Sequence, residues 1–130
     1  GQRSHMEVFG TDYPTRDGTC IRDYIHVTAL IRAHVAALDY LRTGGKSEIF
    51  NCGYSKGFSV LEVIAAVKRV SGVDFDVRLV PRRPGDPAAI VAGSQKIRDQ
   101  LGWQPRHDDL DHIVRTALAW ERQIVGSGGR

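Results

Sequence analysis

The segment Pro81–Pro87 carries the side chains with the clearest potential for ligand binding. Arg82 and Arg83 provide two fixed positive charges there, and Asp86 provides a carboxylate. Prolines fix φ and glycine permits a tight turn, so this loop holds its charges in defined directions. A guanidinium matches phosphate oxygens, and a carboxylate accepts hydrogen bonds from a diol. The residue types predict a ligand with phosphate and hydroxyl groups. A solvated turn in which arginine and aspartate pair is the equal alternative from this segment alone.

A second set of ligand-type side chains lies on a predicted strand over residues 19–27. Apolar residues alternate with polar ones along it: Ile21, Ile25 and Val27 with Arg22, Tyr24 and His26. This period of two places Arg22 and Tyr24 on one face, where a cation beside a ring suits an anionic, ring-containing ligand. The alternative is an exposed pair on a solvated sheet face. Asp23 falls on the apolar face and therefore needs a partner.

The elements that must position these side chains form an α/β pattern. Periodicity predicts helices over 28–43, 59–70, 95–101 and about 108–124, and strands over 47–52 and 74–80. Ser59 and Glu62 match a capping box at the start of the second helix. We expect Thr28 to cap the first helix, and His34 to lie half-buried within its apolar stripe. The strand over 74–80 leads directly into the loop of Arg83, and open α/β sheets place ligands at such strand ends.

Composition and charge argue against several classes of function. The chain is 42% hydrophobic and 25% charged, and its net charge of +3 arises from interspersed signs without a basic stripe. Nucleic acid is therefore not an expected partner. Because no apolar run approaches a membrane span and no signal-peptide pattern is present, we expect a cytoplasmic protein without a membrane partner. Cys20 and Cys52 lack disulfide or zinc spacing, and we do not expect His107 and His112, five residues apart, to form a metal site.

We interpret the chain as one domain over residues 7–125. Residues 1–6 resemble an expression-tag remnant, and residues 126–130 a flexible glycine-rich tail. Gly53 and Gly57 follow a predicted strand, but their G-x-x-x-G spacing matches neither the dinucleotide fingerprint nor the phosphate loop. We therefore expect no cofactor site in these residues.

Five blocks of sequence, in order, resemble the UDP-glucose (UDP-galactose) 4-epimerases of the NAD-dependent epimerase/dehydratase family. They lie at residues 10–27, 50–53, 57–60, 82–86 and 101–105, and the last four read FNCG, GFSV, RRPGD and LGWQP. The resemblance covers Val8 to Ile124. It implies the small mixed α/β substrate-binding lobe of an extended short-chain dehydrogenase/reductase, in its C-terminal part and without the Rossmann part.

The resemblance also implies roles for the residues of the two ligand-type segments. Carried over by position, Arg22 and Arg83 would hold the pyrophosphate of a UDP-hexose. Asp86 would accept hydrogen bonds from the ribose hydroxyls, and Tyr24 would lie beside the nucleoside.

Three apolar residues complete the implied substrate site. Phe9 and Val60 would border the uracil. Ile90 matches the position at which the family adjusts the room for an N-acetyl group, and a medium-sized branched side chain there leaves that specificity open.

The activity implied by the resemblance is epimerisation at C4 of a UDP-hexose through a 4-keto intermediate, with NAD as the cofactor of the full-length enzyme. The NAD site and the proton-transfer residues belong to the part outside these residues, so we expect this chain alone to be inactive and to contain no catalytic residue. A homodimeric full-length enzyme and self-association of the lobe are also expected. The alternatives are another UDP-sugar epimerase, dehydratase or decarboxylase of the superfamily, or a non-catalytic nucleotide-sugar-binding module.

Overall fold

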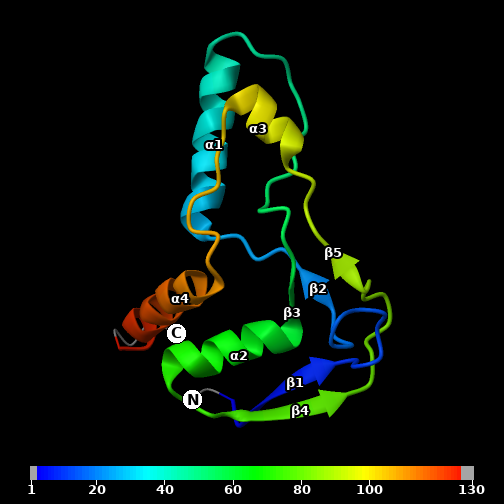
Figure 1. The fold of residues 1–130 in the computed structure, drawn as a ribbon. Helices are drawn as coiled ribbons and strands as arrows, with labels where there is room; N and C mark the ends of the chain where they lie inside the picture. Colours follow the sequence, from blue (N-terminus) through cyan, green and yellow to red (C-terminus); the bar gives the residue numbers. More distant parts are fainter. Residues whose placement is uncertain (1–2, 127–130) are drawn as a thin grey trace.

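The computed structural model describes residues 3–126 and contains four helices and two small sheets there (Figure 1). In chain order the elements are β1 (His5–Phe9), β2 (Ile21–Arg22), α1 (Val27–Arg42), β3 (Phe58–Ser59), α2 (Val60–Ser71), β4 (Asp76–Val80), β5 (Ala89–Ile90), α3 (Gln95–Leu101) and α4 (Leu110–Gly126). Strand β1 pairs in parallel with β4, and β2 lies between antiparallel β3 and parallel β5. Figure 1 shows α2 between the β1–β4 sheet and α4, with α1 and α3 at the opposite end. No helix within residues 3–126 has the length and apolar character needed to cross a bilayer.

The β1–β4 sheet leads the chain into the predicted ligand loop. Phe9 pairs with Val80, so the end of β1 lies beside the start of that loop. The predicted strand over 74–80 is confirmed, although it begins at Asp76. His5 and Met6, which fall within the proposed tag remnant, lie in β1 and pair with β4. Residues 1–2 and 127–130 lie outside the described residues, and the proposed domain boundaries stay predictions.

The predicted strand over residues 19–27 is wrong except at Ile21–Arg22, and helix α1 already begins at Val27. The extended backbone of His26 (φ −68°, ψ 137°) forms the N-cap of that helix. Its Nδ1 accepts a hydrogen bond from the backbone N–H of Thr28 at 3.1 Å. The expectation that Thr28 caps the helix is therefore wrong, since the imidazole of His26 supplies the acceptor.

The predicted strand over residues 47–52 is also wrong. These residues belong to no strand, and the side chain of Ile49 is 86% exposed. A strand requires a hydrogen-bonded neighbour, and none lies beside this segment within residues 3–126. Apolar character alone therefore did not make it a strand.

Helix α1 packs on the core through its small residues. The main core cluster contains Ala29, Ala33, Tyr54, Ile97 and Trp103. The indole N–H of Trp103 donates to the carbonyl of Ala29 at 3.0 Å, which ties α1 to the segment after α3. His34 is exposed rather than half-buried as predicted, although its Nδ1 lies 2.9 Å from the carbonyl oxygen of Leu30. Five apolar residues on the outer face of α1 are each more than half exposed: Val27, Ile31, Val35, Leu38 and Leu41. Self-association through such a face stays a prediction.

Three histidines join the start of α1 to the start of α4. The ring centroid of His26 lies 5.2 Å from that of His107 and 5.4 Å from that of His112, and the latter two rings stack at 4.7 Å. His26 is 7% exposed, and its Nε2 lies 3.0 Å from the hydroxyl of Thr116. Because Nδ1 accepts the capping hydrogen bond, the ring caps the helix only when Nδ1 carries no proton. Burial lowers the pKa of His26, and the neighbouring His107 and His112 act in the same direction.

We expect the free energy of unfolding to fall as the pH falls below about 6.5, the ordinary pKa of histidine in an unfolded chain. Because the folded-state pKa of His26 is lower, the unfolded chain binds more protons in this range, and the stabilisation is lost as pH falls through the folded-state value. Thermal unfolding between pH 7.5 and 5 measures the effect. His26→Asn, which retains an acceptor for the cap, should flatten the pH dependence.

His34→Asn is the matched control for this experiment. His34 lies on the exposed face of the same helix, so its replacement should leave the pH dependence intact. An unchanged pH dependence in His26→Asn would contradict the assignment.

Candidate ligand-binding site

The loop between β4 and β5 brings Arg22, Arg83 and Asp86 together. The Nε of Arg83 donates to Oδ2 of Asp86 at 3.0 Å, and Nη2 of Arg22 lies 4.0 Å from Oδ1 of the same carboxylate. The side chain of Arg83 is 60% exposed, whereas that of Asp86 is 24% exposed. One carboxylate therefore lies between two guanidinium groups. The arginine–aspartate pairing anticipated for a solvated turn is present, but it includes Arg22 from another strand.

Backbone carbonyls fix the direction of the Arg22 side chain. Its Nη1 donates to the carbonyl oxygen of Ile21 at 2.8 Å and to that of Pro87 at 2.9 Å. Parallel pairing of β2 with β5 places Arg22 opposite Ile90. Two predicted site residues from distant parts of the sequence therefore become neighbours in one sheet, and the second nitrogen of Arg22 faces Asp86.

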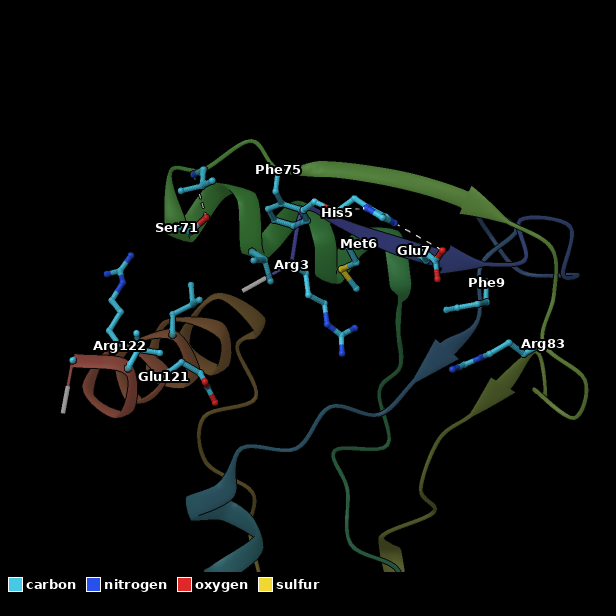
Figure 2. Close-up of a pocket in the computed structure, with 16 residues that line it drawn as sticks. Arg3, His5, Met6, Glu7, Phe9, Ser71, Phe75, Arg83, Glu121 and Arg122 are labelled. Carbon is cyan, nitrogen blue, oxygen red and sulfur yellow. Dashed lines mark hydrogen bonds and ion pairs between the residues drawn. The ribbon is translucent and has the colours of Figure 1, made fainter. Parts of the chain in front are cut away.

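Phe9 supports the other guanidinium. The guanidinium carbon of Arg83 lies 4.5 Å from the centroid of the Phe9 ring, which is cation–π contact distance. Figure 2 shows Phe9 and Arg83 next to each other at one end of a groove that runs along β1 toward α4. This large groove has a volume of about 1520 Å³ and is lined by residues of β1, α2 and α4. Phe9, Arg83, Asp86 and Arg22 thus form one connected cluster, which we call the arginine cluster.

Arg82 makes different contacts from its neighbour. Its Nε donates to Oδ1 of Asp12 at 2.6 Å, and its guanidinium carbon lies 4.0 Å from the centroid of the Tyr13 ring. The Arg82 side chain hydrogen bond lowers the pKa of Asp12. Of the two adjacent arginines in the loop, only Arg83 therefore faces Asp86.

Val60 and Tyr24 lie close to β2 but outside the arginine cluster. Val60 begins α2, and its backbone N–H donates to the carbonyl of Cys20 at 3.1 Å, so only its half-buried side chain is available to a ligand. Tyr24 is half-buried beyond the end of β2 rather than on a common strand with Arg22. Burial raises the pKa of its hydroxyl, while the charge of Arg22 acts in the opposite direction.

A smaller hollow is lined in part by Arg22. This hollow has a volume of about 520 Å³ and is lined by Arg22, Asp23, Ile90 and segments 50–52 and 91–93. Ile90 is 54% exposed at its rim. Residues 50–52 were not predicted as site residues, although the FNCG block that contains them was the available signal. Burial raises the pKa of the Cys52 thiol, and Asp23 adds to this shift.

The partner that Asp23 needs is a set of backbone N–H groups. Its Oδ1 accepts from the N–H of Tyr54 at 3.0 Å, and its Oδ2 accepts from those of Ser55 at 3.0 Å and Ala92 at 3.3 Å. The prediction that Asp23 requires a partner is confirmed. The carboxylate joins the end of β2 to a turn and to the segment after β5.

No group of three or more potential ligands among residues 3–126 is arranged to hold a metal ion. The three clustered histidines do not change this result, because both ring nitrogens of His26 contact protein atoms. The arginine cluster itself offers two guanidinium groups, one carboxylate and one aromatic face, which are groups suited to contacts with anions and diols.

Relatives of known name match the whole chain. The UDP-glucose 4-epimerase of Azospirillum brasilense is 55% identical over 130 residues, which are 100% of this chain and 37% of that protein. The chain thus spans little more than a third of this relative. The resemblance to UDP-glucose 4-epimerases predicted from the sequence blocks is confirmed.

Solved structures of such enzymes share the fold. The UDP-Glc/GlcNAc 4-epimerase of Campylobacter jejuni is 54% identical, with a TM-score of 0.87 over 95% of this chain and 37% of that one. The UDP-glucose-4-epimerase of Stenotrophomonas maltophila, solved with bound NAD and formylated UDP-arabinopyranose, is 43% identical, with a TM-score of 0.93 over 98% of this chain and 38% of that one. These matches confirm the predicted fold, a small mixed α/β part of an extended short-chain dehydrogenase/reductase.

A family model gives the assignment for most of the chain. The model described as GDP-mannose 4,6 dehydratase matches residues 1–116, which include the arginine cluster and the hollow. The chain therefore belongs to the GDP-mannose 4,6 dehydratase family.

Proposed function

We propose that this chain is the UDP-sugar-binding part of an NAD-dependent UDP-glucose/UDP-galactose 4-epimerase. The observation that carries the proposal is the arginine cluster, in which Asp86 lies between the guanidinium groups of Arg22 and Arg83. The 55% identity to the Azospirillum brasilense enzyme supports the choice of substrate class. A homodimeric full-length enzyme and a cytoplasmic location stay predictions.

The cluster would bind a UDP-sugar by exchanging one anion for another. The pyrophosphate replaces the Asp86 carboxylate as the partner of Arg22 and Arg83, because bidentate arginine–phosphate hydrogen bonds are charge-assisted and strong. The released carboxylate can then accept from the ribose hydroxyls. Phe9 holds the Arg83 guanidinium in place and offers its ring to the uracil in the large groove.

NAD would be held by the remainder of the full-length protein. A Cβ on Gly53 would lie 2.5 Å from Oδ2 of Asp23, and one on Gly57 2.3 Å from the side chain of Ile21. We infer that these two glycines serve internal packing. NAD bound to the remainder of the protein would supply reversible hydride transfer at C4 of the sugar. This chain would contribute binding energy that orients the sugar for that reaction.

Epimerisation of UDP-N-acetylglucosamine is the second candidate activity. The Campylobacter jejuni relative, 54% identical, is named a UDP-Glc/GlcNAc 4-epimerase. The exposed Ile90 at the rim of the hollow is where an N-acetyl group would compete for space. The sequence is also compatible with a UDP-sugar dehydratase or decarboxylase and with a non-catalytic nucleotide-sugar-binding module.

We expect UDP to shift the amide NMR signals of Arg22, Tyr24, Val60, Arg83 and Asp86 in the 130-residue chain.

Arg83→Ala should weaken UDP binding by about thirtyfold, since it removes a charge-assisted hydrogen-bonding fork from the phosphate. Isothermal titration calorimetry of the two chains with UDP measures this difference.

Arg82→Ala is the matched control, because it removes the same charge from the same loop while Arg82 faces Asp12 and Tyr13. It should bind UDP nearly as the wild type does. Because Arg83 pairs at an exposed site, its loss should leave the melting temperature almost unchanged. Equal weakening in both variants, or wild-type affinity in Arg83→Ala, would contradict the site assignment.

A chimaera tests activity and specificity together. In it, this chain replaces the 130 aligned residues of the Azospirillum brasilense enzyme, and turnover of UDP-glucose is the expected result. Ile90→Ser should raise the ratio of kcat/KM for UDP-N-acetylglucosamine to that for UDP-glucose by about tenfold, because a smaller side chain widens the hollow.

Leu79→Ser serves as the control, since Leu79 is an exposed apolar strand residue outside the hollow. The Leu79→Ser chimaera should have the same ratio of kcat/KM values for the two substrates as the unsubstituted chimaera. An unchanged ratio in Ile90→Ser would refute the specificity role, and an inactive chimaera would count against the epimerase function.

A further inference from the structure

We propose that Asp23 is a positioning residue that sets the shape of the hollow and thereby the affinity for the sugar part of a UDP-sugar. The inference rests on the proposed function. Asp23 itself need not touch the ligand, since its carboxylate is already occupied by three backbone N–H groups.

Backbone hydrogen bonds, rather than a cation, stabilise the carboxylate of Asp23. Within residues 3–126 it forms no ion pair, and its acceptors are used by Tyr54 and Ser55, 31 and 32 residues away, and by Ala92, 69 residues away. A carboxylate that accepts several N–H hydrogen bonds holds the donating segments in a fixed relation. Asp23 therefore fastens three distant segments at one point.

Close packing makes this arrangement specific. A Cβ added to Gly53 would lie 2.5 Å from Oδ2 of Asp23 and 2.6 Å from Cβ of Ala92, so only glycine lets the three segments approach this closely. Ser55 has a left-handed backbone (φ 57°), and its hydroxyl donates to the carbonyl of Ala92 at 3.0 Å. The turn that contains Tyr54 and Ser55 is thus joined to the segment after β5 twice, once through the Asp23 carboxylate and once through the Ser55 hydroxyl.

The strands that carry Arg22 and Ile90 are too short to fix the hollow by themselves. Strands β2 and β5 contain two residues each. Asp23 immediately follows Arg22, and Ala92 lies two residues beyond Ile90, the residue paired with Arg22. The hydrogen bond from Ala92 to Asp23 therefore extends the alignment past the end of the paired strands, at the wall of the hollow.

The position of the hollow indicates which part of the ligand it receives. Arg83 and Phe9 line the large groove, and Arg22 lines the hollow. Asp86 contacts both arginines, so a diphosphate bound in its place would extend toward both cavities. With the uracil against Phe9, the sugar lies toward Arg22 and Ile90. Loss of the Asp23 clamp should then affect the sugar more than the nucleotide.

The test compares UDP and UDP-glucose binding to the 130-residue chain and to Asp23→Asn by calorimetry. An amide cannot accept from all three N–H groups, so the wall of the hollow loses its alignment. We expect Asp23→Asn to raise the Kd of UDP-glucose by about tenfold and that of UDP by no more than about twofold.

Asp17→Asn is the matched control. Asp17 is also a half-buried carboxylate that accepts from the N–H and the hydroxyl of Thr19 and from the hydroxyl of Ser59, but it does not line the hollow. It should change the Kd values of UDP and UDP-glucose by the same factor. Equal factors in Asp23→Asn would show a merely structural role and overturn the inference while leaving the proposed function intact. If the wild-type chain binds neither UDP nor UDP-glucose, both this inference and the proposed function are overturned.

Discussion

The pairing of a two-residue strand on both of its sides is the constraint on which the candidate site depends. Strand β2 aligns with β3 on one side, where the N–H of Val60 donates to the carbonyl of Cys20. On the other side it aligns with β5, and the N–H of Ile21 donates to the carbonyl of Ala88 at 2.8 Å. The start of α2, the arginine at the end of β2 and the residue at the hollow's rim are thereby brought together. Few hydrogen bonds perform this alignment, so side-chain contacts such as those of Asp23 matter more here than in a long sheet.

The contacts that stabilise the fold are largely separate from those that would bind a ligand. The core cluster around Trp103 joins α1 and α3 through buried apolar contacts and a hydrogen bond to Ala29. The Arg83–Asp86 pair is exposed on its arginine side, and such pairs contribute little to stability. The charges of the loop are therefore available for binding, because the fold does not depend on keeping them paired.

Local sequence patterns predicted the features that depend on neighbouring residues. The capping box of Ser59 and Glu62 forms as predicted, and the strand before the loop of Arg83 is present. Hydrogen bonds between residues far apart in the sequence were not predicted. The cap of α1 comes from His26, whose ring is held by Thr116 some 90 residues away, and the backbone donors to Asp23 lie 31 to 69 residues away.

The same reasoning explains which side-chain contacts of the candidate site could be predicted. Arg22, Arg83 and Asp86 were proposed as ligand-binding residues from their types and from the family resemblance, and the structure brings their side chains together. That Arg82 points to Asp12 instead could not be read from two adjacent arginines, because the choice depends on the position of Tyr13 and Asp12 in another loop. The segment over 47–52 has an apolar strand-like composition, yet strand formation depends on a neighbour that the local sequence cannot specify.

The carboxylate between Arg22 and Arg83 also determines how strongly salt would influence ligand capture. With Asp86 in place, the unliganded cluster presents one net positive charge rather than two. Its field at long range is correspondingly weaker, and screening over about 8 Å at physiological ionic strength removes much of what remains. A dianionic diphosphate would therefore gain less from electrostatic steering than it would from two uncompensated arginines. Its encounter rate with this surface would depend correspondingly less on ionic strength, and more of the contribution of the two arginines would be felt in how slowly the bound nucleotide leaves.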